Sequence, residues 1–230
     1  FEINPYATLA CRIKTSAHRI QLDRLRSEIS QLQTFYSQRV SAGTPPTSSP
    51  PKGFRTRSAF YSPAVLHKVL TILDFVSGIE DAGVRDLFRL AFAATMVRYS
   101  NYSYEPSLGR RVSAGKQEIL DFPVGRAVLV KLNQMAQDIS WLRANLPRRQ
   151  PEVRVIDRSF FQYEECLAPE TVDMIITSPP YLNNYHYNRN TRPQLYWLGC
   201  VENSSDLKWL EHANFGTYWQ TVRERDHVGL

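Results

Sequence analysis

The chain has 230 residues, of which 43% are hydrophobic and 22% are charged, and its formal net charge is +6. This composition supports a buried core, in one domain with an insertion or in two small domains, and it excludes a chain that is disordered throughout. Because no apolar stretch is long enough to cross a membrane and no signal peptide is present, we expect a cytoplasmic protein with no membrane partner.

The cysteine and histidine residues do not indicate a metal site. Cys11, Cys166 and Cys200 are far apart in the sequence, with no Cys-x-x-Cys pair, and the five histidines show no ligand spacing. We therefore expect neither a disulfide framework nor a bound metal.

The first seven residues predict the end of a strand followed by the start of a helix. Glu2 stands at the carboxyl end of the strand, Asn4 is a good N-cap, and Pro5 suits the first helical position, where its missing N–H costs nothing. Apolar residues then recur at spacings of three and four, which predicts one long helix within residues 1–40. This apolar stripe, which we expect to pack on later helices of the same chain, contains Tyr6, Leu9, Ile13, Ile20, Leu22, Leu25, Ile29, Leu32 and Tyr36.

Positive charge is concentrated in the first sixty residues. They hold nine Lys or Arg and three Asp or Glu, so 9 − 3 equals the whole net charge of +6, and the other residues balance. Such a region is the electrostatic footprint of phosphate contacts, although a solvated helix face is the commoner meaning of charge on a helix. The candidate phosphate contacts are Arg12, Lys14, Arg19, Arg24, Arg26, Arg55 and Arg57.

A linker and a helical block follow the basic region. Residues 41–53 are rich in Ser, Thr, Pro and Gly, which predicts a flexible or extended linker. Residues 54–150 contain three predicted helices: one opens at Ser62-Pro63, one runs from about Asp81 to Tyr99, and one runs from about Val124 to Asn145. Because the block stands between two predicted strands, we expect it to be an insertion into an α/β sheet.

The segment Arg98–Tyr104 interleaves aromatic residues with a cation and an amide. Aromatic rings stack on bases, cations hold phosphates, and Asn reads adenine edges, so Arg98, Asn101 and Tyr102 are candidate DNA contacts. The alternative is a Tyr-rich polar loop that covers one end of the helical block.

Two later segments have the pattern of strands. Val153–Asp157 alternates apolar and polar residues and ends in a carboxylate, for which an Asp that caps a turn is the simple alternative. Val172–Ile176 is predominantly apolar and leads into Thr177-Ser178-Pro179-Pro180-Tyr181. Ligands of α/β sheets bind just past the carboxyl ends of the strands, which is where this loop is expected.

The loop after Thr177 has the chemistry of a site for an amino group on a planar base. Pro179 and Pro180 lack an N–H and hold φ near about −65°, so the carbonyls of Ser178 and Pro179 stay free of ladder pairing and point in fixed directions. Tyr181 adds a flat face on which a base stacks, as enzymes that act on extruded bases require. An ordinary strand ending in a Pro-Pro turn with a packed Tyr is the alternative.

Three of these segments resemble one enzyme family. Thr177–Tyr181 resembles the catalytic motif (Asp/Asn/Ser)-Pro-Pro-(Tyr/Phe) of the S-adenosylmethionine-dependent amino methyltransferases of DNA. Ser in the first place is most typical of enzymes that methylate N4 of cytosine, whereas Asp or Asn is more usual in adenine enzymes. Phe1–Ala7 resembles the second cofactor motif of the family, and Val153–Asp157 resembles its next strand, whose terminal acid lies near the cofactor adenine. Leu195–Gly199 also resembles members of this family.

The resemblance implies three sets of site residues. The catalytic loop comprises Ser178, Pro179, Pro180 and Tyr181. The cofactor S-adenosylmethionine is held by Glu2, Asn4, Pro5, Asp157 and Thr177, and Glu2 accepts hydrogen bonds from the ribose hydroxyls. The base pocket is lined by residues that continue the loop, namely Asn183, Asn184, Tyr185, His186 and Tyr187.

One motif of the family is missing from the sequence. The glycine-rich turn Phe-x-Gly-x-Gly, which stands before the second cofactor motif, has no counterpart among the ten scattered glycines. Backbone amides of that turn approach the methionine part of the cofactor, where a side chain would block them. We therefore expect an upstream segment or a second polypeptide to supply the turn, and the chain to be a fragment or one piece of a split enzyme.

The expected fold is α/β, a Rossmann-like class I methyltransferase sheet, present in part, with a large helical insertion. Its parts are the second cofactor motif with the basic helix (1–40), the linker (41–53), the helical insertion (54–150) and the catalytic part (151–230). The expected activity is site-specific methyl transfer from S-adenosylmethionine to the exocyclic amine of a base flipped out of double-stranded DNA. The most favoured target is N4 of cytosine, and the expected location is the nucleoid. Two alternatives stay open: an RNA exocyclic-amine methyltransferase, and a catalytically silent DNA-binding subunit of a split methyltransferase.

Overall fold

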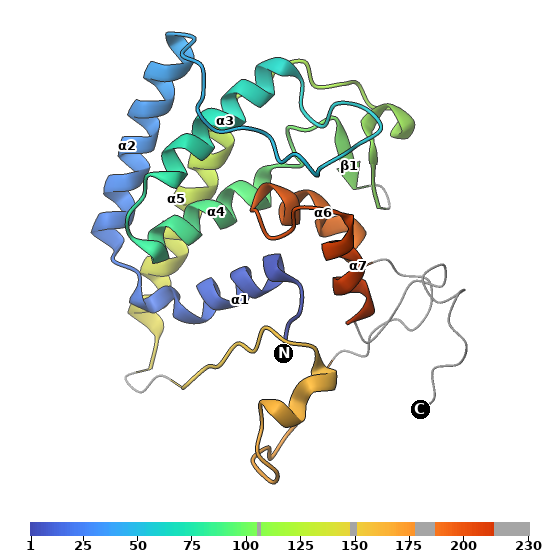
Figure 1. The fold of residues 1–230 in the computed structure, drawn as a ribbon. Helices are drawn as coiled ribbons and strands as arrows, with labels where there is room; N and C mark the ends of the chain where they lie inside the picture. The colour runs from blue at the N-terminus through green and yellow to red at the C-terminus, as the bar shows by residue number, and fades with distance from the viewer. Residues whose placement is uncertain (105–106, 148–150, 178–186, 214–230) are drawn as a thin grey trace, which may run out of the picture.

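The computed structural model describes residues 1–104, 107–147, 151–177 and 187–213. This part of the chain is mostly helical and contains one small antiparallel sheet of two strands (Figure 1). None of its helices is both long and apolar enough to cross a membrane. In chain order the elements are α1 (Pro5–Ser16), η1 (Ala17–Arg19), α2 (Leu22–Ser41), α3 (Pro63–Ser77), α4 (Ala82–Thr95), β1 (Tyr102–Tyr104), β2 (Leu108–Arg110), η2 (Arg111–Ala114), α5 (Val124–Asn145), η3 (Phe160–Glu165), α6 (Tyr187–Trp197) and α7 (Ser204–His212).

The single long helix predicted for residues 1–40 is wrong, because the chain breaks between α1 and α2. Ile20 and Gln21 are both extended, with ψ of 129° and 102°. The carbonyls that this break exposes are satisfied by the guanidinium of Arg143, which donates to His18 O at 3.0 Å and also to Ile20 O. A distant arginine thus stabilises a bend that no local spacing of apolar residues reveals.

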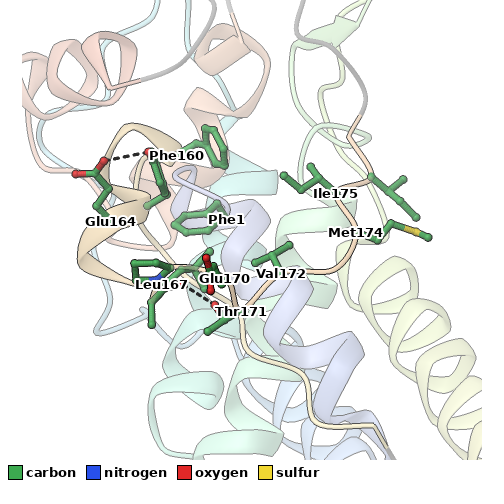
Figure 2. Close-up of a pocket in the computed structure, with 13 residues that line it drawn as sticks. Phe1, Phe160, Glu164, Leu167, Glu170, Thr171, Val172, Met174 and Ile175 are labelled. Carbon is green, nitrogen blue, oxygen red and sulfur yellow. Dashed lines mark hydrogen bonds between the residues drawn. The ribbon is translucent and has the colours of Figure 1, made fainter.

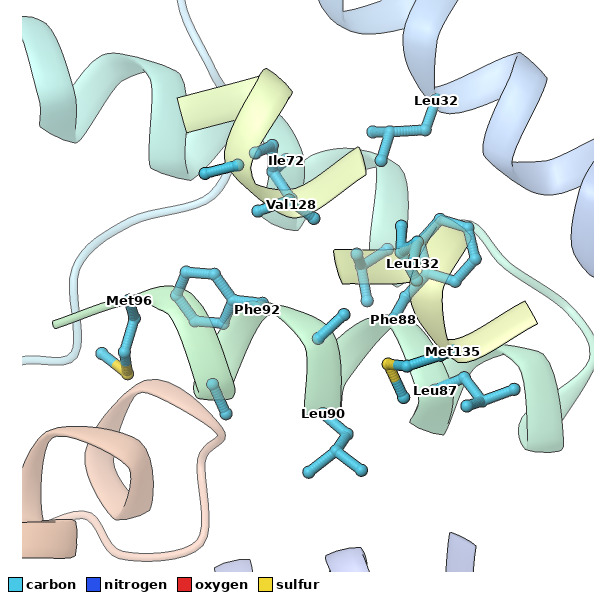
Figure 3. Packing of buried hydrophobic residues seen from close by; sticks show 14 of the residues in the cluster. Leu32, Ile72, Leu87, Phe88, Leu90, Phe92, Met96, Val128, Leu132 and Met135 are labelled. Atoms are coloured by element: carbon cyan, nitrogen blue, oxygen red, sulfur yellow. The ribbon is translucent and has the colours of Figure 1, made fainter. Parts of the chain in front are cut away.

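The apolar stripe of α2 is covered by the protein's own helices, as the sequence predicts. Leu25 and Leu32 are fully buried, and α2 packs against α3 and α5. Figure 3 shows Leu32 of α2 facing the side chains of α4 and α5, among them Phe88 and Leu132. Residues 1–40 and 54–150 therefore share one hydrophobic core, in which each fully buried Leu or Phe contributes about 1.5–3 kcal/mol of transfer free energy.

The three helices of the central block confirm their predicted starts. The Ser62 side chain caps α3 by accepting from Val65 N, and Pro63 takes the first helical position. Asp81 caps α4 by accepting from Val84 N at 2.9 Å. The third helix, α5, has the predicted bounds Val124–Asn145, whereas α4 ends earlier than predicted, at Thr95.

The linker has no regular secondary structure after α2, and it is held in its middle and at its end. The Asp74 carboxylate on α3 accepts hydrogen bonds from Thr47 N, from Thr47 Oγ1 and from Ser48 N, at 2.8, 2.8 and 2.6 Å. At the end of the linker, Gly53 passes so close to Glu202 that an added Cβ would lie 1.7 Å from the Glu202 carbonyl oxygen. The linker therefore fastens α3 to the turn between α6 and α7.

Two further helices, α6 and α7, close the described part of the chain. At the end of α6, Cys200 N donates to Leu195 O at 2.8 Å and Gly199 N donates to Tyr196 O at 3.0 Å, with Gly199 at φ 68°. These two bonds form a Schellman motif, which requires the left-handed conformation that glycine adopts without strain. Asn203 and Asp206 then form a capping box at the start of α7.

The predicted strands at 153–157 and 172–176 are not formed within the described residues. Both segments lack ladder pairing, and Met174, Ile175 and Ile176 are 74%, 73% and 88% exposed. A strand is stable only when a neighbour pairs with its backbone, and the described chain brings no such neighbour to 172–176. Among the described residues the sheet that does form, β1 with β2, lies instead in the central block.

Candidate functional site

Asn4 and Pro5 start α1 as the sequence predicts, whereas the strand expected to end at Glu2 is not formed, because residues 1–4 have no regular secondary structure. Asn4 Oδ1 accepts from Tyr6 N at 3.0 Å and from Ala7 N at 3.3 Å, and Pro5 is the first helical residue. Glu2 Oε1 in turn accepts from Asn4 N at 2.8 Å. One carboxylate oxygen of half-buried Glu2 is therefore engaged in holding the turn, and the other has no protein partner in the described part of the chain.

Asn4 also joins the start of α1 to α6. Its Nδ2 donates to Thr191 Oγ1 at 2.8 Å and to Asn188 Oδ1 at 3.2 Å. Because α6 begins at Tyr187, six residues after Tyr181, these bonds tie the second cofactor motif to the helix that follows the proposed catalytic loop in sequence.

Glu2 lies beside Asp157. Glu2 N donates to Ile156 O at 2.9 Å, so the ends of the two segments that the resemblance assigns to cofactor binding are neighbours. Asp157 itself is exposed and forms an ion pair of 2.8 Å with Arg12. The hydrogen bond from its own backbone N–H, followed by the hydrogen bond and charge of Arg12, lowers the pKa of the Asp157 carboxyl below its usual value.

A hollow of about 900 Å³ opens next to this pair of segments. Figure 2 shows Phe1 on one side of the hollow and the segment with Val172, Met174 and Ile175 on the other. The Phe1 ring packs edge-to-face against Phe160, with ring centroids 5.6 Å apart. The lining is mainly apolar, and it joins the residue before Glu2 to the segment that leads into Thr177. Its size is within the range of sites for small ligands.

Most of the predicted catalytic and base-pocket residues lie outside the described part of the chain. They are Ser178, Pro179, Pro180, Tyr181, Asn183, Asn184, Tyr185 and His186. Thr177, which the resemblance assigns to the cofactor, is the last described residue before this gap and is exposed.

The three candidate DNA contacts of the central block have different surroundings. Asn101 is buried: its Oδ1 accepts from Ile119 N at 2.8 Å and its backbone N donates to Phe60 O. Tyr102 is buried as well, stacked on Phe60 with its hydroxyl accepting from Ser58 N. Only Arg98 is exposed, and its guanidinium lies 5.8 Å from the centre of the Phe122 ring.

Asn188 and Thr191 are site residues that sequence reasoning missed. Asn188 is 3% exposed, and its Nδ2 is a buried donor without an acceptor among the described residues. Leaving such a donor unpaired costs about 1–3 kcal/mol, so a ligand atom or another residue that accepts from it would stabilise the site. The available signal was the pair of polar residues at i and i+3 immediately after the loop, a spacing that places both on one helix face.

The described residues hold no cluster of metal ligands, and one of the three cysteines, Cys200, is a poor nucleophile. No group of three His, Cys, Asp or Glu residues that could hold a metal ion occurs among them. All three cysteines are free, and burial raises the pKa of the Cys200 thiol above its usual value. A raised pKa leaves little thiolate at neutral pH, so Cys200 is a poor nucleophile.

Comparison with known proteins adds no assignment. No family model, no curated protein and no solved structure matches this chain.

Proposed function

We propose that the chain is part of an S-adenosylmethionine-dependent DNA amino methyltransferase whose target is the exocyclic amine of a flipped base, N4 of cytosine. The observation that supports the proposal is the proximity of its motifs. Glu2 is hydrogen-bonded to Ile156 beside Asp157, and Asn4, two residues on, is hydrogen-bonded to Thr191 on the helix that follows the Ser-Pro-Pro-Tyr segment. The proposed fold for the complete domain is a Rossmann-like sheet that carries residues 54–150 as a helical insertion.

The residues at this place fit the cofactor in their chemistry. The free carboxylate oxygen of Glu2 is an acceptor suited to ribose hydroxyls, and the Asp157 carboxylate is an acceptor suited to the adenine amine. Bound S-adenosylmethionine supplies the methyl group as an electrophile on sulfur. The apolar hollow is lined by Phe1, the residue before Glu2, whereas Asp157 lines a separate hollow together with Arg12.

The roles that we assign to the loop follow from its residue types. Ser178 Oγ and the Pro179 carbonyl accept hydrogen bonds from the amino group and so orient the nitrogen lone pair, and the ring of Tyr181 stacks on the base. Asn183, Asn184, Tyr185 and His186 line the base pocket. Positioning of this kind supplies most of the acceleration in a transfer that needs no covalent intermediate on the protein.

A further segment is required to complete this site. Four apolar residues of the extended segment, Val172, Met174, Ile175 and Ile176, are between 49% and 88% exposed. A run that is apolar on both faces is typical of a central strand of a parallel sheet, which is covered on both faces and paired on both edges. We propose that the strand and glycine-rich turn missing from these 230 residues pair here, supplied by another part of the polypeptide or by a partner.

Nucleoside analysis after a methylation reaction tests the proposal. The complete gene product, with any polypeptide that co-purifies, is incubated with duplex DNA and S-adenosylmethionine carrying a labelled methyl group, and the digested DNA is analysed by mass spectrometry. Labelled N4-methylcytosine is the expected product, and labelled N6-methyladenine would correct the target base. Label in RNA alone would replace DNA by RNA as substrate, and DNA binding without any labelled nucleoside would establish the silent subunit instead.

A further inference from the structure

A second hollow, of about 420 Å³, is lined by five arginines from three separate segments of the chain. Arg55 and Arg57 come from the stretch after the linker, Arg110 ends β2, and Arg189 and Arg192 lie on α6. We call this group the arginine pocket. The lining residues that the structure describes include no Asp or Glu.

The five arginines lie together around one hollow, and none of them has a carboxylate partner among the described residues. Arg12, Arg24 and Arg158 each form an ion pair, as do Arg26 and Arg89. Within the described ranges, none of the five guanidinium groups of the arginine pocket does so. Like charges held together raise the free energy of the folded chain, and a bound anion removes that cost.

The structure also holds one of these arginines in place. The Arg192 guanidinium lies 5.7 Å from the Phe54 ring centre and 5.8 Å from the Tyr196 ring centre, and its Nη2 donates to Arg55 O at 2.8 Å. Its Nε is buried and has no acceptor among the described residues. A guanidinium fixed by two rings and a carbonyl loses little conformational entropy when it binds an anion.

We propose that the arginine pocket binds backbone phosphates of a nucleic-acid strand, and that this strand carries the base on which the proposed enzyme acts. Guanidinium groups match phosphate oxygens with paired donors, and several such groups spread over three segments suit a series of phosphates better than one ion. The choice of duplex DNA over other polyanions rests on the proposed function.

The helix α6 connects this pocket to the candidate site. Asn188 and Thr191, on one face, contact Asn4, whereas Arg189 and Arg192, each one residue further on and thus about 100° around the helix, line the arginine pocket. α6 starts six residues after Tyr181, so Arg189 and Arg192 are close in sequence to the Ser-Pro-Pro-Tyr segment. The basic first sixty residues are divided accordingly: Arg12, Arg24 and Arg26 have acidic partners, and Arg55 and Arg57 line the pocket.

The test measures duplex affinity by fluorescence anisotropy over a series of salt concentrations. The variant R110Q/R189Q removes two charges from the pocket, and the control R126Q/K208Q removes two from exposed positions on α5 and α7 that do not line it. Loss of two phosphate contacts should flatten the log–log salt slope by about 1.8 in the pocket variant and leave it unchanged in the control. The variant R110K/R189K, which keeps both charges, should keep most of the slope.

The outcomes separate this proposal from the proposed function. Equal slopes for R110Q/R189Q and its control, with unfolding curves like the parent's, would overturn the arginine pocket even if methylation persisted. If R110Q/R189Q flattens the slope but the parent protein never methylates DNA, the arginine pocket is supported and the proposed methyltransferase activity is refuted. If R110Q/R189Q loses affinity for single-stranded RNA but not for duplex DNA, duplex DNA is overturned as the ligand of the pocket.

Discussion

The Asn4 side chain donates a hydrogen bond to Thr191 Oγ1 at 2.8 Å, across 187 positions of the sequence. The same side chain caps α1 through its Oδ1 and donates a second bond to Asn188. One amide therefore fixes the start of α1 and the position of α6, so its two ends have separable effects.

Substitutions at Asn4 should resolve these two effects. Asn4→Ser keeps a capping oxygen and removes the bonds to α6, and we expect it to lower the free energy of unfolding by about 1 kcal/mol. Asn4→Ala removes the cap as well and should cost about 1 kcal/mol more, as loss of an N-cap typically does. Chemical denaturation measures both values. A Ser variant as stable as the parent would show that the link to α6 contributes nothing.

Glu2 should affect cofactor binding more than DNA binding. Glu2→Ala is expected to weaken S-adenosylmethionine binding by about 1–3 kcal/mol, the range for hydrogen bonds to a charged acceptor, with DNA affinity unchanged. Glu2→Gln keeps an oxygen for Asn4 N and should lose less. Calorimetry on the complete gene product makes the comparison, and an unaltered cofactor affinity in the Ala variant would refute the assignment of Phe1–Ala7 as a cofactor motif.

Tyr181, which lies outside the described residues, should affect methyl transfer more than cofactor binding. Tyr181→Ala removes a stacking face worth about 1–3 kcal/mol per base, whereas Tyr181→Phe keeps it and serves as the control. Rates of methyl transfer and cofactor affinity are measured on the same preparations. Parallel losses of both in the Ala variant would instead make Tyr181 a residue of the core.

A structural feature was predictable from the sequence where the residues that determine it are adjacent in the chain. Ser62 and Asp81 each cap the helix that directly follows, so α3 and α4 were predictable from their starts. The bend after Arg19 depends on Arg143, and the position of α6 depends on Asn4. Both partners are distant in sequence, so no local pattern predicts these contacts.

The same distinction explains the outcome at the candidate site. The turn at Asn4 was predictable because the cap, the proline and the helix are adjacent in sequence. The strand expected at Val172–Ile176 was not formed, because pairing requires a neighbour and none is present among the described residues. The arginine pocket was predictable only in part. Arg55 and Arg57 belong to a basic region that the sequence shows, but the arginines on β2 and α6 reach them only in the folded chain.

Asp74 should make the stability of the linker contact depend on pH. Burial acts to raise the pKa of this carboxyl, but the hydrogen bonds from Ser48 and Thr47 outweigh it, and the folded-state pKa lies below the usual 3.8. A depressed pKa means that the contribution is complete above the unfolded-state pKa and is lost as the pH falls through the folded-state value. Asp74→Asn should therefore be less stable than the parent at pH 7 by about 1 kcal/mol, and the difference should disappear once the pH lies below the folded-state pKa. Denaturation curves at pH 7 and at a series of acid pH values test this, and a difference that does not shrink as the pH falls would rule out the titration of Asp74 as its cause.

Gly53 should tolerate no side chain, because its backbone passes against the turn that joins α6 and α7. A Cβ at this position would lie 1.7 Å from Glu202 O and 3.0 Å from the Tyr196 ring, and a backbone carbonyl cannot move aside as a flexible side chain can. Gly53→Ala should therefore destabilise the protein by about 1–3 kcal/mol, the usual cost of overpacking. It should also weaken DNA binding, since the displaced segment carries Arg55 and Arg57 into the arginine pocket. Gly109→Ala, whose Cβ would meet its nearest neighbour at an ordinary 3.7 Å, is the control within the same pocket, and thermal unfolding with anisotropy titrations compares the two. Equal stability of the two variants would mean that the contact between the linker and Glu202 is not maintained in solution.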